Sequence, residues 1–233
     1  MTRPPLPVAE TVPDFEALGL VAFTTQRQAG SFALHGDEPS AVVWDRWIAL
    51  AQALGAERLI SAHQVHGVKV LSHTGEWSGI LRASEADGHM AWSGSTAMAV
   101  TLADCIPVFI GHPAGVGAIV HSGWKGTAAG ITQVAITALD AVGYRAADLR
   151  VHAGPGICGR CYEVGPEVYS RLTGRRAEQP TPVDLRALIA DCARAAGVRA
   201  VSVSTSCTRC DNDRFYSHRC GDLGRQLGVL RTR

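Results

Sequence analysis

Three residues that can bind a soft metal each lie at or near the end of a short apolar stretch of this sequence. Cys105 follows the run 97–103, His121 follows the run 116–120, and His66 comes earlier in the chain. Thiolate and imidazole together favour zinc or copper over magnesium or calcium. A catalytic zinc usually has three protein ligands and an open fourth position, where the pKa of a bound water falls to about 7. We therefore predict that His66, Cys105 and His121 are both metal ligands and catalytic residues, with Zn²⁺ as the metal and Cu²⁺ as the other possibility.

Three neighbouring side chains compete for roles around such an ion. Asp104 precedes Cys105 directly, and we expect its carboxylate to orient a metal-binding imidazole. His63 lies three residues before His66, on the opposite face of an extended segment, so it is the weaker candidate ligand. His89 follows the turn signal Asp-Gly, and we expect it to be exposed.

An anion site is expected beside the metal. The segment Gly123-Trp-Lys-Gly-Thr127 follows a predicted strand and begins a predicted helix, where backbone N–H groups and the helix dipole favour a phosphate. Lys125 would add a positive charge, and Arg27 and Arg46 are further candidates for binding substrate or phosphate. The segment differs from a Walker loop because its lysine precedes the second glycine.

Apolar patterns define the elements that must position these residues. Short runs rich in β-branched and small residues predict strands at 65–71, 97–103, 116–120 and 198–203. Helical spacing predicts helices over 40–54, 126–142 and 184–196, with Ser40 and Asp184 as N-caps and a glycine after each C-terminus. Strands and helices alternate without a strict βαβ rhythm, which favours a mixed α/β fold with helices outside a mixed sheet.

Composition bounds the function. The chain has 233 residues, 46% of them hydrophobic, and a formal net charge of +1, so we expect one domain over residues 1–233 and no nucleic-acid partner. No stretch approaches the roughly 18 apolar residues of a membrane span, and the N-terminus lacks a signal-peptide core. The expectation is a cytoplasmic protein, a monomer or small homo-oligomer, acting on a small molecule.

The seven cysteines allow a second metal site. Cys158 and Cys161 form one Cys-x-x-Cys pair, and Cys207 and Cys210 form another. Paired thiols at this spacing are typical of structural zinc sites, but the gap between the pairs is far longer than in a zinc ribbon. A second zinc is therefore the less favoured interpretation, and Cys192 is expected in the core.

Five motifs in order resemble the YfiH or laccase-domain family, variously called multicopper polyphenol oxidase, purine nucleoside phosphorylase and peptidoglycan editing factor. The resemblance extends from Phe23 to Leu230. The motifs lie at 64–67, 102–107, 121–127, 154–157 with 161–165, and 207–208 with 215–219 and 224–226.

The resemblance implies zinc bound by His66, Cys105 and His121, the same residues that the ligand chemistry selects. It also implies a mixed α/β fold shared with the catalytic domain of cytotoxic necrotizing factor. The implied activities are phosphorolysis of adenosine, inosine and methylthioadenosine, and deamination of adenosine.

This sequence departs from the family near Arg27. Ala29 stands where the family has a glycine, the following loop is shorter, and the family's Asn-Arg pair is replaced by Asp45-Arg46. One wall of the pocket, and with it the substrate, is expected to differ.

Other functions remain open. One is a hydrolase with Cys105 as nucleophile and His121 as base, acting on a peptidoglycan precursor such as a UDP-muramoyl amino acid. Another is a zinc-binding interaction module without catalysis. A copper laccase has the least support, because no His-x-His pair occurs among the nine histidines.

Overall fold

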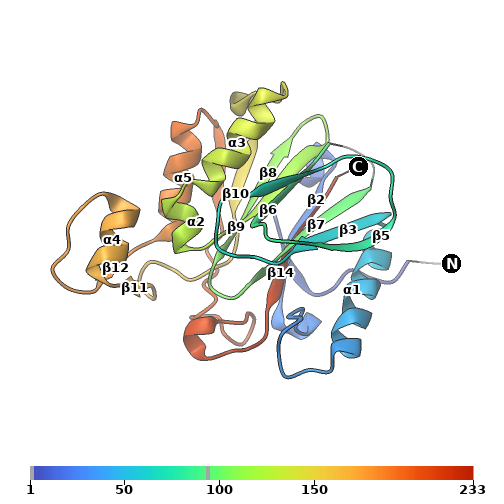
Figure 1. The fold of residues 1–233 in the computed structure, drawn as a ribbon, viewed down its shortest axis with the longest axis horizontal. Helices are drawn as coiled ribbons and strands as arrows, with labels where there is room; N and C mark the ends of the chain where they lie inside the picture. The colour runs from blue at the N-terminus through green and yellow to red at the C-terminus, as the bar shows by residue number, and fades with distance from the viewer. Residues whose placement is uncertain (1–2, 93–94, 233) are drawn as a thin grey trace.

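The protein is built from two six-stranded sheets that pack face to face, with helices on both outer faces (Figure 1). The computed structural model describes residues 3–92 and 95–232. The first sheet has the order β1-β2-β14-β7-β3-β5. Its strands are β1 (Ala9–Thr11), β2 (Val21–Thr25), β14 (Gln226–Arg231), β7 (Thr96–Leu102), β3 (Arg58–Ala62) and β5 (Gly79–Ala83).

The second sheet has the order β13-β10-β8-β9-β6-β4. Its strands are β13 (Ala200–Val203), β10 (Arg150–Ala153), β8 (Ile106–His112), β9 (Val116–Ser122), β6 (Gly88–Ala91) and β4 (Val70–His73). Both sheets mix parallel and antiparallel pairs, for example β3 parallel to β7 and β8 antiparallel to β9. Two further strands, β11 (Glu163–Val164) and β12 (Thr181–Pro182), form a small ribbon.

The central strands are apolar without a break because both of their faces are buried. In β7, Ala97 and Ala99 belong to the cluster under helix α1 (Ser40–Leu54), whereas Met98 and Val100 belong to the cluster between the sheets. This alternation follows from the two-residue period of a strand. The mixed α/β class predicted from the sequence is confirmed, and the structure has two mixed sheets flanked by helices.

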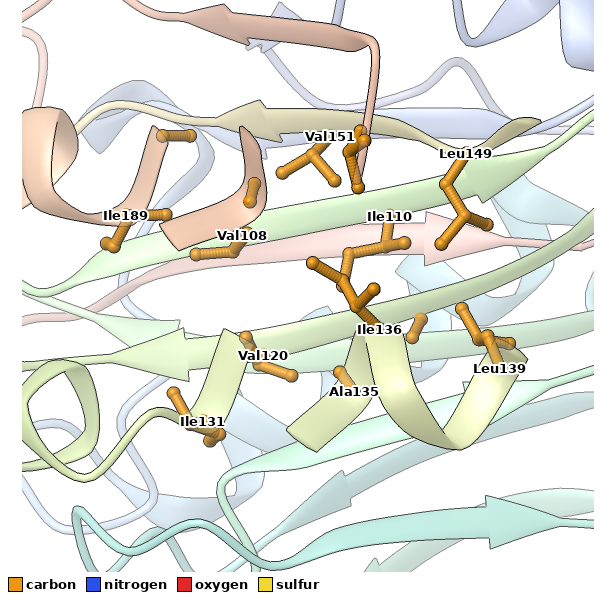
Figure 2. Close-up of a cluster of buried hydrophobic side chains, with 14 of the residues drawn as sticks. Val108, Ile110, Val120, Ile131, Ala135, Ile136, Leu139, Leu149, Val151 and Ile189 are labelled. Atoms are coloured by element: carbon orange, nitrogen blue, oxygen red, sulfur yellow. The ribbon is translucent and has the colours of Figure 1, made fainter. Parts of the chain in front are cut away.

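The outer face of the second sheet carries three helices: α2 (Trp124–Ala128), α3 (Ile131–Ala141) and α5 (Leu185–Ala195) (Figure 1). Figure 2 shows their contact with the sheet, where Ile136 and Leu139 of α3 and Ile189 of α5 lie over Val108 and Ile110 of β8. Helix α4 (Pro166–Thr173) lies farther out. Short 3₁₀ turns are η1 (Glu16–Leu18), η2 (Arg27–Ala29), η3 (Ala146–Asp148) and η4 (His218–Cys220).

The predicted helices are confirmed with two differences. Asp184 caps α5 through the backbone N–H groups of Arg186 and Ala187, as expected, but Ser40 begins α1 without capping it. The predicted helix 126–142 is two helices, because Gly130 takes φ +80° between α2 and α3. The strand predicted at 65–71 begins only at Val70, and the residues before it form a loop. None of the helices in the described part of the chain has the length and apolar character needed to cross a membrane.

Candidate active site

Three of the predicted site residues meet at the ends of interior strands of the two packed sheets. His66 lies in the loop after β3, Cys105 in the turn that connects β7 of one sheet to β8 of the other, and His121 near the C-terminal end of β9. One ligand atom from each lies within 4.8 Å of the others. The two imidazole rings meet edge to face, with centroids 4.8 Å apart. The fold therefore brings together a donor set, two imidazoles and one thiol, that suits zinc or copper.

Asp87 organises both histidines. Its Oδ1 lies 2.9 Å from Nδ1 of His121, and its two oxygens accept hydrogen bonds from the backbone N–H groups of Val65, His66 and Gly67 at 3.2, 2.9 and 2.7 Å. The bond to His121 leaves Nε2 of that ring free for a metal or the thiol. The three hydrogen bonds from these backbone N–H groups hold His66 at φ +61°, a left-handed conformation that is costly for a residue with a β-carbon.

These contacts change the ionisation of the site. Burial acts to raise the pKa of Cys105, but the nearby imidazoles of His121 and His66 outweigh it and lower that pKa to about 6. Burial acts to lower the pKa of His121, but Cys105 and Asp87 raise it to about 9. Burial acts to raise the pKa of Asp87, but the hydrogen bonds from His121 and from the backbone N–H groups of the loop lower it. Without a metal, the pair is a thiolate and an imidazolium at neutral pH.

Asp104 does not fill the role expected for it. Its Oδ1 accepts a hydrogen bond of 2.6 Å from Thr208 Oγ1, and its Oδ2 accepts one of 2.8 Å from the backbone N–H of Arg219. Asp104 has φ +78° and so forms the turn that presents Cys105. The carboxylate that orients an imidazole is Asp87, 34 residues before His121. The sequence analysis did not select Asp87, because Asp87-Gly88 reads as an ordinary turn dipeptide and no local pattern relates it to His121.

Two cavities share Cys105 in their linings, and both are also lined by His66 and His218. The larger, about 400 Å³, extends to Arg82, Arg225 and the loop residues 33–35. We name it the arginine cavity. The other, about 380 Å³, has Trp124, Tyr162, Ile157 and Leu185 on its walls, together with Lys125 and Arg219. We name it the aromatic cavity.

The three predicted anion-binding residues separate in the structure. Lys125 lines the aromatic cavity, and its Nζ lies 5.7 Å from the Trp124 ring centroid. Arg27 donates to Asp222 at 2.6 Å and to two backbone carbonyls, and Arg46 donates to Glu38 and to the carbonyl of Ser31. Neither arginine lines either cavity beside Cys105.

Arg82 was missed by the sequence argument. It lies in β5, whose neighbour β3 leads into the His66 loop, and it lines the arginine cavity. Among the residues that the structure describes, it has no hydrogen-bond or ion-pair partner, and partial burial lowers its pKa. A cation that is partly desolvated and unpaired in a cavity is suited to bind an anion.

Two other histidines were assigned positions from the sequence, and the structure agrees for His63 but not for His89. His63 is exposed and lines the arginine cavity, outside the ligand cluster. His89, expected at the surface, is 1% exposed and its Nδ1 lies 3.0 Å from Nε2 of His73. Asp87 and Gly88 do not form an exposed turn, because Gly88 is the first residue of β6, a strand with four buried residues that includes His89.

The fold and site define a mixed α/β protein with a cysteine and two histidines at the junction of two sheets. Residues 25–233 match the family described as multi-copper polyphenol oxidoreductase laccase, and the chain belongs to that family. The resemblance inferred from the motifs is thereby confirmed.

Named relatives and solved structures agree with this assignment. The chain is 33% identical over 205 residues to purine nucleoside phosphorylase ORF3 of Streptomyces griseus, covering 84% of this chain and 83% of the relative. It is 33% identical over 232 residues to a purine nucleoside phosphorylase of Deinococcus radiodurans, covering 90% and 87%. The crystal structure of YlmD from Geobacillus stearothermophilus aligns with a TM-score of 0.87 at 26% identity over 95% of this chain and 94% of that one. The hypothetical protein YfiH of Bacillus licheniformis shares the fold, with a TM-score of 0.87 at 23% identity over 97% of each chain.

Proposed function

We propose that the protein is a zinc-dependent purine nucleoside phosphorylase that acts on adenosine, inosine and methylthioadenosine, with adenosine deamination as a second activity. The observation that carries the proposal is the convergence of His66, Cys105 and His121 between two cavities, with Asp87 behind His121. The names of the relatives supply the substrate class.

The donor set fits zinc. A thiolate and two imidazoles are soft ligands, and the lowered pKa of Cys105 provides the thiolate at neutral pH. Asp87 fixes the tautomer of His121, as carboxylates behind metal-binding histidines commonly do. When bound there, zinc would act as a Lewis acid toward an oxygen of the substrate or of water.

The two cavities suit the two substrates of phosphorolysis. Trp124 and Tyr162 give the aromatic cavity the flat apolar walls that a purine requires. Arg82 and Arg225 give the arginine cavity positive charge for phosphate. The ribose would then lie between them, beside Cys105, where the two cavities share their lining.

In the reaction, a phosphate oxygen forms a bond to the anomeric carbon as the bond to the base nitrogen breaks and its electron pair leaves with the purine. The departing base needs hydrogen-bond donors. Burial raises the pKa of Tyr162 to about 12, so its phenol keeps its proton, and Lys125 lies in the same cavity. Both can donate to the base.

The test is nucleoside turnover combined with metal analysis. In phosphate buffer we expect free base and ribose 1-phosphate from the three nucleosides, and in phosphate-free buffer ammonia from adenosine. Cys105→Ala is expected to lose both activities and roughly one equivalent of zinc, whereas Cys192→Ala, in α5, retains them. The proposal would be refuted if the parent protein released neither base nor ammonia from any of the three nucleosides.

A second function is favoured by the same residues in a metal-free state. The order carboxylate, imidazole, thiolate in Asp87, His121 and Cys105 is that of a cysteine hydrolase, which could cleave a UDP-muramoyl amino acid. A chelator separates the two functions, because a metal-bound thiolate is a poor nucleophile. Amide hydrolysis that increases with chelator would favour the hydrolase, and nucleoside turnover that disappears with chelator would favour the phosphorylase.

A further inference from the structure

A second cluster of thiols lies outside the site described above. Cys158, Cys161, Cys207 and Cys210 each bring Sγ within 4.8 Å of the other three sulfurs, and the Cys161 and Cys210 sulfurs are 3.5 Å apart. Four sulfurs around one zinc ion, each at about 2.3 Å, lie roughly 3.8 Å from one another. The cluster therefore has the dimensions of a tetrathiolate site.

The backbone builds this cluster from two tight turns. The N–H groups of Cys161 and Tyr162 both donate to the carbonyl of Cys158 at 3.0 Å. In the other turn, the N–H of Asp211 donates to the carbonyl of Cys207 at 2.8 Å, and the Asp211 carboxylate accepts from the Cys207 N–H at 3.0 Å. Each turn brings its two sulfurs together.

Tertiary structure joins the two turns. Gly156 and Cys207 form a parallel β-bridge, and the N–H of Thr208 donates to the carbonyl of Gly156 at 3.2 Å. The long gap in sequence, which disfavoured a zinc ribbon, is thus closed by pairing between the segments that carry the cysteines. A contact between the turns, from the N–H of Cys158 to Sγ of Cys207 at 3.2 Å, suits a sulfur that carries negative charge.

We propose that these four cysteines bind one structural zinc ion, separate from the metal proposed at Cys105. Four protein sulfurs complete a tetrahedral shell and leave no position for substrate, as in structural zinc sites. Zinc with four thiolates carries a net charge of −2. Arg160 and Arg186 line the cavity beside Cys158, Cys207 and Cys210, together with Asp184 and Asp211, and Arg209 donates to the carbonyl of Cys161 at 3.3 Å.

The ion would also support the turn that presents Cys105. Thr208, next to Cys207, donates to the Asp104 carboxylate at 2.6 Å, and the N–H of Ile157, next to Cys158, donates to the Asp104 carbonyl at 3.0 Å. Both cysteine turns therefore contact Asp104 through the residue beside a ligand. Loss of the ion is expected to loosen this turn and to weaken metal binding at Cys105 indirectly.

Cobalt substitution tests the proposal. In Cys105→Ala the first cluster lacks its thiolate, so sulfur-to-cobalt charge-transfer bands can arise only elsewhere. After dialysis against chelator, we expect Cys105→Ala to bind Co²⁺ with the intense bands of a tetrahedral tetrathiolate and to exchange it for one equivalent of Zn²⁺. Adding Cys210→Ser removes one of the four thiolates and should lower the affinity for Co²⁺ by more than the roughly tenfold to hundredfold that is typical of losing a group behind a metal ligand. Cys220→Ser, which removes an exposed cysteine outside the cluster, is the matched control and should leave the spectrum unchanged.

Two results would overturn the proposal. One is a Cys105→Ala protein that shows no thiolate-to-cobalt bands. The other is freshly purified, metal-free protein whose intact mass is lower by two or four hydrogens, which would identify the cluster as disulfides. The Cys105→Ala spectrum decides the question even if Cys210→Ser does not fold. Because that variant lacks the thiolate required for the proposed phosphorylase, either proposal can fail without the other.

Discussion

A β-carbon placed on Gly123 would lie 2.8 Å from Sγ of Cys105 and 3.1 Å from the His66 ring. Gly123 is the N-cap of α2 and has φ −81°, a backbone conformation open to any residue. A glycine is therefore required here by the space around the site and not by the backbone.

We predict that Gly123→Ala displaces the Cys105 sulfur and weakens metal binding. Overpacking a filled site typically costs about 1–3 kcal/mol, so the expected loss of zinc affinity is about fivefold to 150-fold, with a comparable loss of turnover. Competition with a zinc chelator measures the affinity. The matched control is Gly165→Ala, at the N-cap of α4 with φ −65°, where no atom of the described residues beyond the two chain neighbours lies within 4 Å of the added carbon. Equal affinities in the two variants would contradict the prediction.

Asp87→Asn is predicted to lower zinc affinity by about tenfold to a hundredfold, the usual range for a carboxylate behind a metal-binding histidine. An amide has one acceptor oxygen in place of two, so it cannot hold His121 and the loop amides as the carboxylate does. The control is Asp222→Asn, which removes the carboxylate bound to Arg27. That variant should lose stability but keep the affinity of the parent, as judged by thermal unfolding and metal competition. If Asp87→Asn binds zinc as tightly as the parent protein, Asp87 does not position the ligands.

Buried His152 is predicted to make the protein less stable as the pH falls. Burial lowers its pKa from 6.5 to about 4, with Glu10 opposing weakly, and its Nδ1 lies 2.8 Å from Ser202 Oγ. Between pH 6.5 and 4 the unfolded chain binds a proton at this residue that the folded protein does not, so the free energy of unfolding decreases as pH decreases through this window. A shift of about 2.5 units corresponds to about 3 kcal/mol at pH 4.

The measurement is chemical denaturation of the parent and of His152→Asn at several pH values. The carboxylates, and the His73 and His89 pair, titrate alike in both proteins, so their contributions cancel in the difference. The variant should lose less stability than the parent between pH 6.5 and 4. Parallel pH profiles would show that His152 is protonated in the folded protein.

Local sequence determined much of what could be predicted. Asp184 caps its helix through bonds to residues two and three positions along, and Gly55 ends α1 with φ +57°, so both ends follow from nearby residues. The donor chemistry of His66, Cys105 and His121 was likewise visible in the sequence.

Long-range contacts could not be predicted in this way. Asp87 approaches His121 because β6 pairs with β9, and Cys158 meets Cys207 through a bridge between distant segments. The sequence suggested Arg27 as a cation available to bind an anion. In the structure its guanidinium is bonded to Asp222 and to backbone carbonyls close to the C-terminal strand. Each of these depends on tertiary structure that no short window contains.

The ligands and the walls of the arginine cavity come from different kinds of structure. Cys105 and His121 are fixed by the ends of buried strands, whereas Ala33, Leu34 and His35 belong to the short loop after η2. Insertions and replacements in that loop alter the shape of the cavity without moving the strand ends. We therefore expect changes in this loop to alter which small molecules fit the cavity while the proposed metal ligands stay in place.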